Sequence, residues 1–141
     1  MASVNPYLNF HGNTEEAFNF YRSVFGGEFL ALQRFSDTEH GASLPDHEKN
    51  MIMHIALPFG NGNIIMGTDT LASTGQTLEK GNNVSLCVTP DTKEEGERLF
   101  KGLSQGGTVT LPYEKAFWGA YFGMLTDKFG VQWMINYDEK K

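Results

Sequence analysis

Two segments of the chain carry the same pattern, and this internal repeat constrains the fold more than any other feature of the sequence. In each segment, apolar residues recur at the three- and four-residue spacing that one face of an amphipathic helix requires. The first set is Ala17, Phe20, Tyr21 and Val24, and the second, offset by 79 residues, is Gly96, Leu99, Phe100 and Leu103. Each set is followed by a glycine pair, Gly26-Gly27 or Gly106-Gly107. Glycine readily adopts the left-handed conformation that ends helices.

One short strand precedes each predicted helix and three follow it. The predicted strands are residues 5–10, 28–35, 51–59 and 63–68 in the first half, and 83–89, 108–112, 119–126 and 131–137 in the second. Asn13 and Asp91 are the predicted helix caps, each with a glutamate three residues later. Asn61-Gly62 favours a tight hairpin turn, whereas the polar stretch 36–50 predicts a long mobile loop.

The repeat predicts an α+β fold built from two tandem βαβββ modules. The modules span residues 5–69 and 83–137, and we expect them to form a single domain over residues 1–141. The alternative is an α+β protein in which two unrelated helices happen to share a pattern.

The composition of the chain limits the classes of binding partner and the cellular compartments that we expect for it. The formal net charge of −6 argues against a nucleic-acid partner, since phosphate binding depends on lysine and arginine. The lone cysteine, Cys87, cannot form an internal disulfide, and we interpret it as a buried structural residue rather than a nucleophile. The N-terminus lacks a secretory signal pattern, and no apolar run approaches the roughly 20 residues that span a bilayer. We expect a cytoplasmic protein with no membrane partner.

Three ordered blocks of sequence are similar to a known family. They are NPYLNFHGNTEEAFNFYRSVFGGEF (5–29), MHIALPFGNGNIIMGTD (53–69) and FWGAYFGMLTDKFGVQWMIN (117–136). Together they resemble the PhnB-like branch of the vicinal-oxygen-chelate (glyoxalase/bleomycin-resistance/dioxygenase) superfamily. The resemblance implies that the modules form a curved mixed-sheet cup with the site inside, and that the protein is a homodimer.

The resemblance does not define an activity. The superfamily includes glyoxalases, ring-cleaving dioxygenases and non-catalytic drug-binding proteins. Some relatives carry the label of a ubiquinone-pathway methyltransferase. This sequence offers no glycine-rich loop between a strand and a helix that could cradle a nucleotide cofactor.

Metal-dependent members of the superfamily hold a divalent ion with His, Gln or Glu side chains from four strands. The resemblance places these positions at or near Pro6, His54, Asn83 and Met134. Only His54 is a good ligand, because proline has no side-chain donor and methionine is a soft ligand. We therefore predict no metal and no cofactor. His54 is the catalytic candidate, as a general base or hydrogen-bond donor; the alternative is a structural histidine bonded to a backbone carbonyl.

The predicted ligand-binding residues share a position at strand ends or on the expected cup interior: His54, Asp69, Asn83, Phe117, Trp118 and Met134. Phe117 and Trp118 could stack on a flat ligand, with core or dimer-interface packing as the alternative. Asp69 could be a polar pocket group or a solvated carboxylate.

These observations leave two main functions open. The first is a protein that binds a small hydrophobic or aromatic ligand in the cup without a metal. The alternative is a glyoxalase-like or dioxygenase-like enzyme on a small oxygenated substrate, using His54 with or without a divalent metal. A third possibility is a dimeric scaffold with no ligand.

Overall fold

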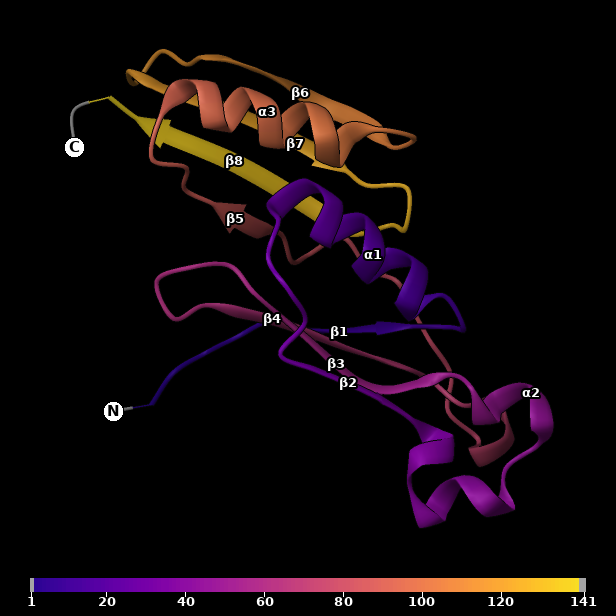
Figure 1. Cartoon of the computed structure of the whole chain (residues 1–141). Coiled ribbons are helices and arrows are strands. Elements are labelled where there is room, and N and C mark those ends of the chain that lie inside the picture. Colours follow the sequence, from indigo (N-terminus) through magenta and orange to yellow (C-terminus); the bar gives the residue numbers. More distant parts are fainter. Residues whose placement is uncertain (1, 140–141) are drawn as a thin grey trace. The chain divides into compact units, whose positions relative to one another are not determined.

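The structure is a computed structural model that describes residues 2–139, except the side chain of His40. The chain divides into two compact units, Met1–Glu79 and Lys80–Lys141 (Figure 1). The predicted modules, residues 5–69 and 83–137, lie one in each unit. Their union in a single domain stays a prediction.

Within residues 2–79, the first unit holds a four-stranded mixed sheet and several helices. Its elements in chain order are β1 (Tyr7–Phe10), α1 (Thr14–Phe25), β2 (Ala31–Arg34), the short helices η1 (Phe35–Asp37), η2 (Glu39–Ser43) and α2 (Asp46–Lys49), β3 (Ile52–Pro58), β4 (Ile64–Asp69) and η3 (Ala72–Thr74). The strand order is β1-β4-β3-β2. β1 runs parallel to β4, and the other pairs are antiparallel.

The second unit, described for residues 80–139, repeats this plan. Its elements are β5 (Leu86–Val88), α3 (Lys93–Ser104), β6 (Thr108–Lys115), β7 (Ala120–Thr126) and β8 (Gln132–Asp138). The strand order is β5-β8-β7-β6, again with the first strand parallel to the last. The predicted α+β fold with two βαβββ modules is therefore confirmed. That the modules close into one curved cup stays a prediction.

Local turn chemistry accounts for the strand limits. Asn61 and Gly62 have φ angles of 54° and 78°, which confirms the predicted hairpin turn between β3 and β4. β2 and β5 are shorter than predicted. β2 starts late because Gly26 and Gly27 both have positive φ and delay the extended chain. β5 starts late because the chain bends at Asn83, outside the strand that was predicted to contain it.

Each long helix covers one face of its own sheet (Figure 1). In both units a phenylalanine of the helix packs on a glycine of the sheet. Phe18 of α1 lies over Gly67 of β4, where an added Cβ would be 2.6 Å from the ring. Phe100 of α3 lies over Gly123 of β7 at the same distance. Because side chains alternate along a strand, the neighbours of each glycine point to the opposite side. That opposite side is called the open face of each sheet.

The start of α1 is held by a residue far away in the sequence. Asn13 occupies the predicted N-cap position, but its side chain makes no capping hydrogen bond. Instead, Asp69 Oδ1 accepts hydrogen bonds from the backbone of Gly12 (2.9 Å) and from the backbone and hydroxyl of Thr14 (3.1 and 2.6 Å). Asp69 Oδ2 accepts from the backbone of Ile52 (2.8 Å). Asp69 is 3% exposed, so the expectation of a solvated carboxylate is wrong.

The N-terminus of α3 is capped one residue later than predicted. The hydroxyl of Thr92, not the side chain of Asp91, accepts a hydrogen bond from the backbone of Glu95 (3.0 Å). The carboxylate of Glu95 accepts in return from the backbone of Asp91 (2.7 Å). The side chains of Thr92 and Glu95 thus accept hydrogen bonds from backbone N–H groups at the start of α3, as in a capping box.

The stretch 36–50, predicted to be a mobile loop, is folded. It forms η1, η2 and α2 over a small core of its own, in which Phe35, Leu44 and Leu71 are buried and Met51 and Met53 pack against them. The apolar residues that drive this folding are few and widely spaced, so they produce no periodic pattern in the sequence.

A buried glutamate ties this folded stretch to η3. The side chain of Glu48 is 2% exposed, and its carboxylate accepts hydrogen bonds from the backbone (3.1 Å) and the hydroxyl of Ser73. The Ser73 hydroxyl is the main cause that lowers the pKa of Glu48 below its usual range.

We expect Asp69→Asn to lower the free energy of unfolding by about 3 kcal/mol, because an amide offers one acceptor oxygen and turns a donor toward backbone N–H groups. Urea unfolding followed by circular dichroism measures this change. The matched control is Asp46→Asn, whose side chain is 99% exposed and whose loss should stay within about 0.5 kcal/mol. Equal losses in the two variants would contradict the role given to Asp69.

Ser73→Ala should make stability less dependent on acidic pH. The folded-state pKa of Glu48 is depressed, so its contribution is present above the unfolded-state pKa and is lost as pH falls through the folded-state pKa. The variant should therefore be less stable than the parent at neutral pH, with the gap narrowing on acidification. Unfolding midpoints measured along a pH series test this.

The control for this series is Ser23→Ala, which removes a neutral hydrogen bond from Ser23 Oγ to the backbone carbonyl of Phe20. Its effect should not vary with pH over the same range. A pH-independent gap for Ser73→Ala would show that Glu48 is not the group concerned.

Candidate functional site

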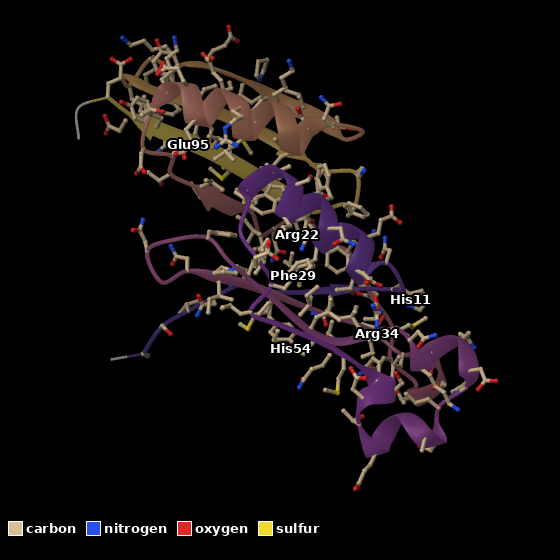
Figure 2. All side chains as sticks on the ribbon, in the orientation of Figure 1. His11, Arg22, Phe29, Arg34, His54 and Glu95 are labelled. Atoms are coloured by element: carbon tan, nitrogen blue, oxygen red, sulfur yellow. The ribbon has the colours of Figure 1, made fainter. Side chains whose placement is uncertain are left out.

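His54, the predicted catalytic residue, lies on the open face of the first sheet and is hydrogen-bonded to Tyr7. His54 precedes Ile55 on β3, and Ile55 pairs with Gly67 beneath α1, so His54 points to the other side. The Tyr7 hydroxyl is 3.0 Å from His54 Nδ1, and the ring centroids are 5.7 Å apart. Figure 2 shows His54 on the side of the strands away from α1. Its partner is a side-chain hydroxyl rather than a backbone carbonyl.

This hydrogen bond defines what the imidazole can offer to a ligand. Burial raises the pKa of Tyr7. The protonated phenol can donate to Nδ1 of His54 or accept from an Nδ1–H, so two tautomers of the imidazole satisfy this bond. In the tautomer that accepts from Tyr7, the imidazole proton is on Nε2, where it is available to a ligand. Acting as a base through Nδ1 would first require the loss of the Tyr7 bond.

A hollow of about 370 Å³ lies in the first unit, and neither His54 nor Tyr7 is among its lining residues. The lining combines apolar side chains with uncharged polar ones and includes one carboxylate. Its residues are Asn9, Phe35, Met53, Thr68, Asp69, Thr70, Leu71, Thr74 and Gln76. Asn9 pairs with Thr68 across β1 and β4, and it is two residues from Tyr7 on the same face. The pairing of β3 with β4 ends at Ile55–Gly67, the residues next to His54 and Thr68. Asn9, which lines the hollow, therefore shares a face of β1 with Tyr7.

Asp69 borders this hollow, but its carboxylate is engaged elsewhere. Its Oδ1 accepts hydrogen bonds from Gly12 and Thr14, and its Oδ2 accepts one from Ile52. These bonds give Asp69 a structural role at the edge of the site. Its predicted contact with a ligand stays a prediction.

Other predicted ligand-binding residues lie in the second unit. Phe117 and Trp118 form the turn between β6 and β7, where they are 98% and 52% exposed, so the alternative of core packing is wrong. Their ring centroids are 5.0 Å apart in an edge-to-face arrangement. Met134 of β8 pairs with Met124 of β7 on the open face. Asn83 is exposed in the bend before β5.

Cys87 differs from its prediction. It is exposed on β5, where it pairs with Met134 of β8. β5 is an edge strand of its sheet, and Cys87 lies on the same face as Met134. The surrounding protein still raises the pKa of the thiol, which disfavours the reactive thiolate.

The donor chemistry at the predicted metal positions does not fit the superfamily's divalent ion. Among the side chains that the structure describes, no three His, Cys, Asp or Glu residues form a group that could hold a metal. Pro6 has no donor, Asn83 is exposed in a bend, and Met134 faces Met124 and Cys87. That the protein works without a metal stays a prediction.

The sequence interpretation missed Tyr7, Asn9 and Thr68 as site residues. A signal for them existed, because Tyr7 and Asn9 alternate on one side of β1 and thus share a face. The pairing of β1 with β4, which brings Thr68 next to them, depends on a parallel register that no local pattern encodes.

Comparisons with known proteins agree with this architecture. The chain resembles solved structures of the glyoxalase/bleomycin-resistance fold, such as one from Albidiferax ferrireducens T118 (TM-score 0.62, 16% identity, covering 96% of this chain and 98% of that one). It is 37% identical to protein PA1353 from Pseudomonas aeruginosa, with a TM-score of 0.85 over 98% of both chains. It is also 32% identical to Protein YjdN of Escherichia coli (strain K12), covering 94% of this chain and 93% of that protein.

The family described as 3-demethylubiquinone-9 3-methyltransferase matches residues 2–136. A PhnB protein from Bacillus cereus, with the same description marked as putative, has 30% identity and a TM-score of 0.74 over 96% of this chain and 99% of that one. The chain therefore belongs to this PhnB-like family, and it shares the fold of glyoxalase/bleomycin-resistance proteins. Among the described residues, no helix is long and apolar enough to cross a membrane.

Tyr7→Phe should change the balance between the two tautomers of His54, because it removes the hydroxyl that is bonded to Nδ1. Nitrogen NMR of the histidine side chains should show mainly Nε2 protonated in the parent, the tautomer that accepts from Tyr7, and a mixture of tautomers in the variant. The free energy of unfolding should change by less than about 1.5 kcal/mol. Tyr137→Phe is the matched control, and a parent His54 protonated on Nδ1 would contradict this expectation.

Proposed function

We propose that the protein binds a small, uncharged, partly apolar molecule on the open face of the first sheet, without a metal. The observation that supports this most is the hollow of about 370 Å³ in the unit that carries the His54–Tyr7 pair. Hollows of this size are typical of small-molecule sites, which combine apolar walls with a few polar groups that orient the ligand.

The lining suggests how the ligand would be held. Phe35, Met53 and Leu71 provide apolar contact, while Asn9 and Thr68 provide hydrogen-bonding groups. His54 donates from Nε2 to an oxygen atom of the ligand. An anionic ligand is disfavoured, because the one carboxylate at this hollow is negative and the lining contains no lysine or arginine.

The methyltransferase activity in the family description is not part of this proposal. The connections from β1 to α1 and from β5 to α3, residues 11–13 and 89–92, contain one glycine, Gly12. Dinucleotide-type cradles use several glycines at such a connection so that the backbone can approach the cofactor. These connections therefore give no support to nucleotide-cofactor binding.

An enzyme that uses His54 is the second candidate function. The observation that favours it is a histidine whose Nδ1 is hydrogen-bonded to the Tyr7 hydroxyl in the unit that carries the hollow. Such an enzyme would resemble a glyoxalase or a dioxygenase and would act on a small oxygenated substrate. Loss of turnover in His54→Ala, with the fold intact by circular dichroism, would support this alternative.

Homodimer formation and a cytoplasmic location remain parts of the proposal. Exposed apolar residues on the edge strand β6, Val109 (44%) and Leu111 (42%), are consistent with a subunit contact.

A fragment library screened by ligand-observed NMR, with hits confirmed by calorimetry, tests the binding proposal. Asn9→Trp fills the hollow from an exposed strand position and should weaken confirmed hits by about tenfold or more. His54→Ala should weaken oxygen-bearing hits by about three- to tenfold, the value of one hydrogen bond. Asn19→Trp, at an exposed position on α1, is the matched control and should leave affinity unchanged.

Elemental analysis of untagged protein, purified without chelator, separates the two candidate functions further. About one equivalent of bound divalent metal per chain, lost in His54→Ala, would overturn the metal-free proposal. Hits that bind Asn9→Trp as well as they bind the parent would show that the hollow is not the site.

A further inference from the structure

Gln76 lines the hollow of the first unit, and the backbone of Leu71 holds its side chain in one orientation. Gln76 Oε1 accepts a hydrogen bond from Leu71 N (2.6 Å), and Gln76 N donates to Leu71 O (3.3 Å). Gly75, with a φ of 85°, turns the chain back between the two residues. The Leu71 contact also identifies the two ends of the side-chain amide, because only its oxygen can accept from a backbone N–H.

This orientation leaves the amide nitrogen of Gln76 available to a ligand. Nε2 donates to no residue that the structure describes, since the contact with Leu71 uses the oxygen. Gln76 is exposed, so a molecule that enters the hollow can reach the amide. The wall thus presents an N–H donor in a fixed direction, and a ligand that lies against it needs an acceptor at that place.

The threonines that line the same hollow have the opposite requirement. The hydroxyls of Thr68, Thr70 and Thr74 each donate to a backbone carbonyl oxygen, at 3.3, 3.2 and 2.9 Å. A hydroxyl has one hydrogen, so these oxygens offer a ligand only lone pairs. A ligand that contacts them therefore has to donate an N–H or O–H.

A neutral carboxamide carries both groups on one carbon atom, a carbonyl oxygen that accepts and an N–H that donates. A cation such as an amidinium has donors but no acceptor for the Gln76 amide. An anion meets the negative charge of Asp69, the one carboxylate of the lining. Phe35 and Met53 provide apolar contact for the remainder of the molecule.

We propose that Gln76 makes the hollow selective for neutral carboxamides that carry an apolar or aromatic group. Gln76 Nε2 donates to the carbonyl oxygen of the ligand, and a threonine hydroxyl of the lining accepts from its N–H. This inference rests on the proposed function, because it names the ligand class of the same hollow.

Gln76→Glu separates this role from a structural one. A carboxylate keeps an acceptor for Leu71 N and replaces the NH₂ donor with a second oxygen. Benzamide and benzamidinium are the probes, since they share the ring and the planar group and differ in the acceptor. In ligand-observed NMR titrations near neutral pH, the parent should bind benzamide about tenfold more tightly than benzamidinium, and Gln76→Glu should reverse this preference.

A third probe, methyl benzoate, tests the donor half of the argument. It keeps the carbonyl oxygen and lacks the N–H, so the parent should bind it about three- to tenfold more weakly than benzamide. Equal affinities for benzamide and methyl benzoate would overturn the role given to the threonines.

Asn19→Asp is the matched control, because it makes the same change from amide to carboxylate at an exposed position on α1 and should leave both affinities unchanged. Gln76→Glu should keep the urea midpoint of the parent, whereas Gln76→Leu should lower it by leaving Leu71 N without an acceptor. An unaltered preference in Gln76→Glu would overturn the assignment. So would a loss of stability in Gln76→Glu as large as that in Gln76→Leu, since Gln76 would then be a structural residue.

The same titrations distinguish a failure of this inference from a failure of the proposed function. If fragments bind in a manner that Asn9→Trp weakens but benzamide does not, the hollow is a binding site and its selectivity for carboxamides is wrong. If Asn9→Trp weakens the binding of neither benzamide nor any other fragment, both proposals are overturned.

Discussion

Four hydrogen bonds converge on the carboxylate of Asp69, at the end of β4, and the architecture of the first unit depends on them. They come from Gly12 and Thr14 at the start of α1 and from Ile52 at the start of β3. The helix start, the hairpin and the last strand are thus fixed to one buried group. A carboxylate this deeply buried is tolerated because both of its oxygens accept hydrogen bonds.

The second unit uses a comparable device at another place. Asp127, 3% exposed, accepts hydrogen bonds from the backbone of Phe129 (2.8 Å) and Val131 (3.0 Å) and from the indole of Trp133 (2.8 Å). Here the carboxylate closes the turn between β7 and β8 instead of joining a helix to the sheet. In both units the buried carboxylate with several backbone donors lies at the end of a strand.

The repeat in the sequence was sufficient to predict both modules, because the stripes of α1 and α3 and the glycines that follow them are local signals. The helix caps were not predictable in the same way. Asn13 looks like a capping residue, yet Asp69 provides the bonds from a distant strand, and sequence spacing carries no trace of that contact. The prediction of a mobile loop over residues 36–50 was wrong for a related reason. The small core that folds this stretch includes Leu71, which lies outside it.

The site was partly accessible to prediction. His54 was found through the resemblance, and its placement on the open face follows from alternation along β3. Its contact with Tyr7 depends on strand pairing between residues far apart in the chain. Pairing registers of this kind are set by tertiary packing, so this contact could not be recognised before the sheet was known.

The parallel pairing of first and last strands has a consequence for how the chain folds. β1 meets β4 through Tyr7 and Met66, and β5 meets β8 through Leu86 and Trp133, so each sheet is completed by contacts distant in sequence. Such contacts form late, because loop closure costs entropy before the contact returns any stabilisation. During synthesis, β1 therefore waits unpaired until β4 has emerged from the ribosome. We expect this exposed strand edge to be the point at which the nascent chain is most open to aggregation or to capture by a chaperone.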